Sequence, residues 1–157
     1  MSSLIKFPGS YGIIVGISLL GLAWLIAWLR IKGESFHFDI HGEKGSFAPL
    51  LSSYLDIAKF VLGLASGSIV LLAGSATLRT TSHVVSYFAS PLFLLALSIL
   101  YGVFFMATMI VNYEGYRHST QPYTRLKYVT NLALGFSCLL CFSVGYLWLV
   151  LNVIRQG

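Results

Sequence analysis

The sequence predicts an all-α integral membrane protein whose single domain, residues 1–157, is a four-helix transmembrane bundle. The chain is 57% hydrophobic and 10% charged, whereas a soluble domain carries roughly 25% charged residues. This composition argues against a soluble enzyme or a nucleic-acid-binding protein. The charged residues also avoid four windows of at least 19 residues, at 7–29, 60–78, 80–113 and 128–154. Because about 20 apolar residues in a helix cross a bilayer core, each window predicts one span.

The first helix is predicted at residues 11–29. Trp24 and Trp28 lie near its end, just before Arg30, and such rings favour the level of the lipid headgroups. The apolar run is longer than the 7–15 residues of a cleavable signal peptide and lacks a small-residue cleavage site. We therefore expect a retained helix.

A polar segment at residues 30–57 follows, and its first half alternates in polarity. Residues 34–42 place aromatic and aliphatic side chains on one face of a strand and polar ones on the other. The pattern predicts a short β-hairpin. A lone hairpin is marginal in water, so we expect it to dock on the membrane, on another subunit or on the loop after helix 3.

The second half of this segment repeats its apolar residues with the spacing of an amphipathic helix: Phe47, Leu50, Leu51, Tyr54, Leu55 and Ala58. We expect an interfacial segment at residues 49–57 that bends or continues into the second span. Asp56 and Lys59 are three residues apart and are expected to form an ion pair at the membrane surface. An exposed pair of this kind contributes roughly 0–1 kcal/mol.

The second helix is predicted at residues 58–78, and its glycines are its most informative feature. Gly63 and Gly67 have GxxxG spacing, Gly74 follows seven residues later, and the first helix repeats the spacing with Gly12 and Gly16. Small residues let helices approach closely in lipid. Two interpretations remain open: these glycines pack within one bundle, or the face on helix 2 contacts another copy or a partner chain.

The third and fourth helices are predicted at residues 85–111 and 126–153, joined by a polar loop at 112–125. No ionisable residue lies in the middle of any span, which argues against a proton-coupled transporter. The histidines lie near helix ends or in loops, so a haem held inside the bundle by two of them is not expected. Cys138 and Cys141 form a CxxC within helix 4 and are interpreted as small buried side chains. No cofactor is predicted.

One candidate metal site lies in the hairpin segment, where His37, Asp39 and His41 share one strand face. Imidazole and carboxylate ligands suit zinc or a similar ion, and His118 falls on the same side of the membrane. A solvated hairpin face is the alternative interpretation of the same pattern.

Basic residues are unequally divided between the two sides of the bundle. The loops 30–57 and 112–125, with their flanks, carry seven Lys or Arg residues, and the other side carries three: Lys6, Arg79 and Arg155. The positive-inside rule places both loops in the cytoplasm and both termini outside. The compact chain without a targeting sequence suggests a bacterial inner membrane.

Together these observations favour a non-catalytic membrane protein that oligomerises or supports a larger membrane complex. The expected partners are the lipid bilayer and a second copy or another membrane protein, and nucleic acid is not expected. One alternative is a pore-forming or membrane-perturbing homo-oligomer lined by serine and threonine. Another is a membrane metal-binding protein that uses the histidines of the hairpin segment.

Overall fold

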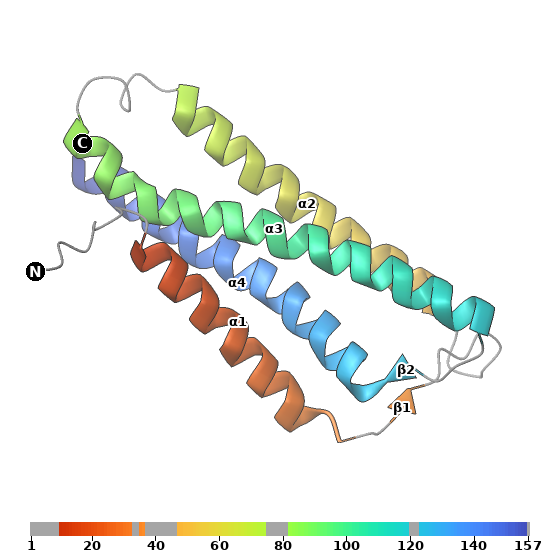
Figure 1. The fold of residues 1–157 in the computed structure, drawn as a ribbon. Coiled ribbons are helices and arrows are strands. Elements are labelled where there is room, and N and C mark those ends of the chain that lie inside the picture. The colour runs from red at the N-terminus through yellow and green to blue at the C-terminus, as the bar shows by residue number, and fades with distance from the viewer. Residues whose placement is uncertain (1–9, 33–34, 37–46, 75–81, 120–122, 157) are drawn as a thin grey trace, which may run out of the picture.

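The computed structural model describes residues 10–32, 35–36, 47–74, 82–119 and 123–156. In these residues the chain forms four helices and two short strands, in the order α1 (Ser10–Arg30), β1 (Ser35–Phe36), α2 (Phe47–Gly74), α3 (Ser82–Ser119), β2 (Tyr123–Thr124) and α4 (Arg125–Gln156). Helices that follow one another in sequence run in opposite directions (Figure 1). We call the end where α1 and α3 begin the terminal end, and the end where they finish the loop end.

Each helix contains an apolar segment long enough to cross a membrane: Tyr11–Arg30, Leu51–Leu72, Phe88–Gly115 and Arg125–Arg155. Large hydrophobic side chains such as Ile14, Leu71 and Leu147 point away from the bundle. In water this outer surface would be strongly unfavourable, whereas in lipid it is solvated by acyl chains. The chain is therefore a four-span integral membrane protein, as the sequence predicted.

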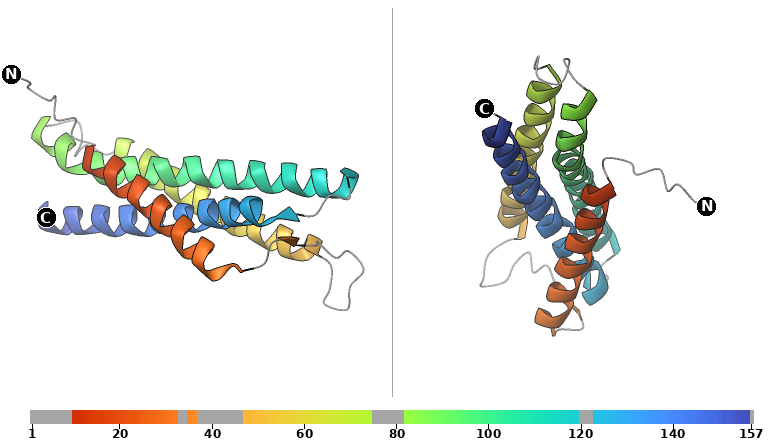
Figure 2. Two further views of the ribbon diagram at one scale, coloured as in Figure 1. Left: turned by 60° about the horizontal axis from the view of Figure 1, so that its bottom comes forward. Right: turned by 90° about the vertical axis from the view of Figure 1, so that its left-hand side faces the viewer.

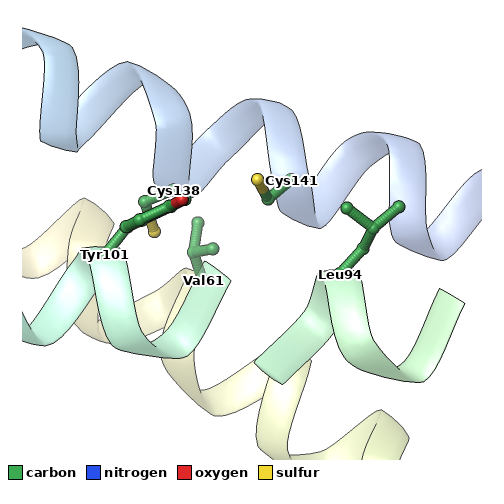
Figure 3. Packing of buried hydrophobic residues seen from close by; sticks show 5 residues of the cluster. All are labelled: Val61, Leu94, Tyr101, Cys138 and Cys141. Atoms are coloured by element: carbon green, nitrogen blue, oxygen red, sulfur yellow. The ribbon is translucent and has the colours of Figure 1, made fainter. Parts of the chain in front are cut away.

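The centre of the bundle is the pair α3 and α4, with α1 and α2 on opposite sides of it (Figures 1 and 2). Five buried residues form the main core cluster, drawn in Figure 3: Val61, Leu94, Tyr101, Cys138 and Cys141. Leu94 and Leu95 of α3 are completely buried. The two cysteines are free thiols in this core, where they act as small packing residues.

The amphipathic segment at residues 49–57 is the first part of α2, which runs from Phe47 to Gly74 without interruption. It continues into the span rather than bending away from it. Its apolar face packs on α3 in a second cluster of buried residues: Leu51, Ala58, Phe105 and Met109. The periodicity predicted an interfacial segment, whereas Leu51 and Ala58 of its apolar face are buried against protein and Tyr54 is exposed.

Helix α3 is longer than the sequence indicated, because residues 112–119, assigned to the polar loop, are helical up to Ser119. Two features account for this. Tyr113 packs against the second cluster, and the sequence has no proline after Pro91 until Pro122, so nothing interrupts the backbone hydrogen bonds. A polar composition outside the bilayer is compatible with a helix that packs on a neighbour.

The two strands connect both loops at the loop end. β1 pairs antiparallel with β2, with Ser35 opposite Thr124 and Phe36 opposite Tyr123. The alternating segment therefore docks on the loop after helix 3, one of the three expected docking sites. The rest of the predicted hairpin, residues 37–42, lies outside the described residues.

Candidate functional site: the outer face of α2

The glycines in the described residues fall into two groups according to what a Cβ atom would meet. Two of those on α1 support close contact with α3. A Cβ on Gly12 would lie 2.7 Å from the Ser90 carbonyl oxygen, and one on Gly16 would collide with Cδ1 of Leu97. The contact at Gly12 is with backbone, which cannot move aside, and both glycines lie against α3, so this GxxxG pair packs within the chain.

Glycines on α3 and α4 serve the same purpose. A Cβ on Gly145 would lie 3.0 Å from the Leu94 Cβ and 3.2 Å from the Pro91 carbonyl oxygen, and one on Gly102 would lie 3.1 Å from the Cys138 Sγ. Gly135 lies equally close to the Phe105 ring. Small residues thus bring the central helices of the bundle together, as expected where lipid removes the hydrophobic drive between helices.

The three glycines on α2 behave differently. A Cβ built on Gly63, Gly67 or Gly74 meets no heavy atom within 4 Å. The residues that attach α2 to the bundle, Val61 and Ala65 among them, lie on the opposite side of the helix. The GxxxG pair of α2 therefore faces away from its own chain.

Large exposed side chains surround these glycines. With helical spacing of three and four residues, one face of α2 carries the following residues, which we call the α2 outer face: Phe60, Gly63, Leu64, Gly67, Leu71 and Gly74. Phe60 is 67% exposed and Leu71 is 78% exposed. The α2 outer face thus alternates bare backbone with projecting apolar side chains, a surface into which the side chains of another helix fit.

The hydroxyl groups near this face are already hydrogen-bonded within α2. Ser66 Oγ donates to the Gly63 carbonyl oxygen at 3.1 Å, and Ser68 Oγ donates to that of Leu64 at 2.8 Å. These bonds back to the helix remove the need for water beside either serine. Closer to the loop end, Lys59 Nζ lies 3.3 Å from Asp56 Oδ1, and both side chains are 66% exposed.

Polar groups inside the bundle connect neighbouring helices. Ser98 Oγ donates to the Cys138 carbonyl oxygen at 2.8 Å, and the Tyr101 hydroxyl donates to that of Gly16 at 3.4 Å. Asn131 Nδ2 lies 3.1 Å from the Met109 Sδ. Such interhelical bonds contribute on average about 0.6 kcal/mol in membrane proteins. They fix how the helices are rotated against one another.

The predicted metal ligands His37, Asp39 and His41 lie outside the described residues, so this site stays a prediction. Within the described part of the chain, no group of three His, Cys, Asp or Glu side chains is placed to hold a metal ion. His118, the fourth candidate, is exposed on the last turn of α3.

Sequence analysis missed one contact at the loop end. The Arg125 guanidinium carbon lies 4.2 Å from the centre of the Trp28 ring, and Arg125 Nη2 donates to the Trp28 carbonyl oxygen at 2.8 Å. From the sequence, Trp28 was interpreted as an interfacial anchor, and Arg125 was counted among the basic residues of the second polar loop, which could meet lipid headgroups or an acidic partner. Because 97 residues separate the two, spacing carried no signal for their contact.

Comparison of the chain with protein-family models, with curated protein sequences and with solved structures found no match.

Proposed function

We propose that this four-span membrane protein is a non-catalytic subunit that associates with copies of itself through the α2 outer face. The observation that carries the proposal is the contrast between its glycines. Helix α3 occupies the space next to the α1 glycines that have GxxxG spacing. Next to the equivalent pair on α2, no atom of the described residues lies within 4 Å of a built Cβ. A helix surface that combines open glycines with exposed apolar side chains is suited to close contact with another helix.

The geometry of the α2 outer face suits a symmetric pair. Copies inserted with the same topology present α2 in the same direction, so two such faces meet in parallel around a two-fold axis. Gly63 and Gly67 then allow the backbones to approach, while Phe60 and Leu71 pack on either side of the crossing point. The pair Asp56 and Lys59 adds no net charge to this face, so it introduces no repulsion between copies.

The test adds bulky side chains to the α2 outer face without altering the packing of the bundle. Because a Cβ at Gly63 or Gly67 meets no atom of the described residues within 4 Å, the double variant Gly63→Leu with Gly67→Leu is expected to fold normally. We expect its dimer in bilayers to weaken by about tenfold or more, corresponding to about 1.4 kcal/mol. Single-molecule photobleaching in vesicles at graded protein-to-lipid ratios measures this change.

A matched control exists in the same chain. Gly21 and Gly115 also have nothing within 4 Å of a built Cβ, so Gly21→Leu with Gly115→Leu adds the same bulk elsewhere. The control is expected to associate like the wild type. A monomeric wild type, or equal weakening in both double variants, contradicts the proposal. Ion conductance in liposomes would instead support a pore-forming homo-oligomer.

The proposal includes an orientation with both loops in the cytoplasm of a bacterial inner membrane. It is supported by the basic residues of the described chain, because Arg30, Lys32, Arg125 and Lys127 gather at the loop end, whereas Arg155 lies at the terminal end. Lys and Arg near helix ends are retained on the cytoplasmic side during insertion.

A further inference from the structure

At the corner where α1 ends and α4 begins, Arg125 is held in place by Trp28, yet some of its N–H groups form no hydrogen bond in the described residues. Its guanidinium stacks on the Trp28 ring and donates one hydrogen bond to the Trp28 carbonyl oxygen. That carbonyl lies in the last turn of α1, where the helix leaves oxygen atoms unpaired and favours a cation. Arg125 therefore has a structural anchor, and of its five N–H donors this bond occupies one.

The Arg125 charge has no carboxylate partner in the described part of the chain. The Nε atom is buried and has no hydrogen-bond partner there. The described ion pair joins Asp56 to Lys59 on α2, away from this corner. A half-buried guanidinium with unused donors is a binding group for an anion, because its planar fork matches the oxygens of a phosphate.

Two more cations lie at the end of α1 beside this contact. Arg30 and Lys32 follow Trp28 by two and four residues, and both are exposed. The pairing of β1 with β2 keeps the two chain segments together (Figure 1). The sequence places one acid, Glu34, between Lys32 and β1. Among the described residues of the corner, Arg30, Lys32 and Arg125 are all cationic.

The same corner also presents an apolar surface directly below its charges. Trp24 and Trp28 stack with their ring centroids 5.2 Å apart, and paired indoles of this kind mark the headgroup level of a bilayer. Leu25, Leu29 and Leu126 are exposed beside them. A ligand that matches both parts has an anionic head and acyl chains.

We propose that this corner, defined by Trp28, Arg30, Lys32 and Arg125, binds the phosphate headgroup of an anionic phospholipid. The acyl chains of the lipid lie along the exposed leucines of α1 and α4. The bound lipid joins the end of α1 to the start of α4 at the membrane surface. This inference is independent of self-association through α2, which lies on the other side of the central helices.

Native mass spectrometry of the full chain, released from nanodiscs containing equal amounts of phosphatidylglycerol and phosphatidylcholine, tests the proposal. We expect the wild type to retain phosphatidylglycerol preferentially. The double variant Arg30→Gln with Lys32→Gln leaves the Arg125–Trp28 contact in place, so the fold is expected to persist. Its retention of phosphatidylglycerol is expected to fall by about fivefold or more, because each cation near an anionic surface adds attraction.

The control removes the same number of positive charges from the side of the bundle that is predicted to hold both termini. The variant Arg79→Gln with Arg155→Gln also loses two positive charges and is expected to retain phosphatidylglycerol like the wild type. Equal loss in both double variants, or equal retention of the two lipids by the wild type, overturns the proposal. Displacement of the lipid by soluble glycerol phosphate would identify a free-phosphate site and would also overturn it.

Discussion

Gly16 and Gly67 each end a GxxxG pattern, yet the two positions have different surroundings. Gly16 lies beneath Leu94 and Leu97 of α3, and Gly67 has nothing within 4 Å of a built Cβ. In both places the residue exposes the helix backbone, but only Gly16 uses that exposure inside the chain. The motif therefore marks helices capable of close approach, and the neighbour decides which approach occurs.

Gly16→Leu is expected to destabilise the folded chain, whereas Gly21→Leu is expected to leave it nearly unchanged. The first substitution forces a side chain into the Leu97 methyl group, and overpacking of this kind costs about 1–3 kcal/mol. Circular dichroism during detergent-induced unfolding measures the difference, at a dilution where the chain is monomeric. Equal stability of the two variants would show that α1 and α3 separate easily.

At the scale of elements, α2 combines two functions in one helix. Its span carries the α2 outer face, and its first turns attach it to α3 through the cluster of Leu51, Ala58, Phe105 and Met109. Helix α3 supplies the surface for this attachment through Phe105 and Met109, which lie within its apolar segment Phe88–Gly115. The attachment orients the α2 outer face away from the bundle.

Leu51→Ala is expected to loosen the first turns of α2 while leaving the main core intact. Leu51 is buried in the second cluster, and shortening a buried leucine removes packing contacts and leaves a cavity. Hydrogen exchange of the backbone amides in residues 47–58 is expected to speed up by about tenfold, as local opening becomes easier. Ser52→Ala, at the exposed neighbouring position, serves as the control. Faster exchange throughout α3 would contradict this local role.

At the scale of the whole molecule, the antiparallel arrangement sorts the polar features to two ends. The paired strands, the Arg125–Trp28 contact and most of the basic residues lie at the loop end, and the terminal end holds the first residues of α1 and the last of α4. An even number of spans requires this separation. Every polar feature at the loop end therefore faces one aqueous compartment.

Labelling with a membrane-impermeant maleimide is expected to distinguish the two ends in intact bacterial cells. Cys138 and Cys141 are buried, so only an introduced cysteine reacts. His118→Cys at the loop end is expected to be protected and Gln156→Cys at the terminal end to be labelled, if the basic loops are cytoplasmic. Neither substitution changes the Lys and Arg count. The reverse labelling pattern would invert the proposed orientation.

Sequence reasoning identified the spans well and their extensions less well. The charge-free windows located all four helices, since lipid penalises each buried charge and each unpaired backbone group within the segment itself. The extension of α3 over residues 112–119 was assigned to a loop, because a polar composition outside the bilayer does not distinguish a solvated helix from a turn. The amphipathic start of α2 was recognised, and its partner on α3 was not.

By itself, the sequence determined that this chain crosses a membrane four times as helices, with no Asp, Glu, Lys, Arg or His in the middle of any span. That follows because solvation by lipid acts on each segment separately, so it can be read from one stretch at a time. Only the tertiary structure showed which GxxxG pair is buried, that Arg125 contacts Trp28, and that the two loops pair through β1 and β2. Those contacts depend on how each helix is rotated and shifted relative to its neighbours. Residues far apart in the chain jointly determine these rotations and shifts.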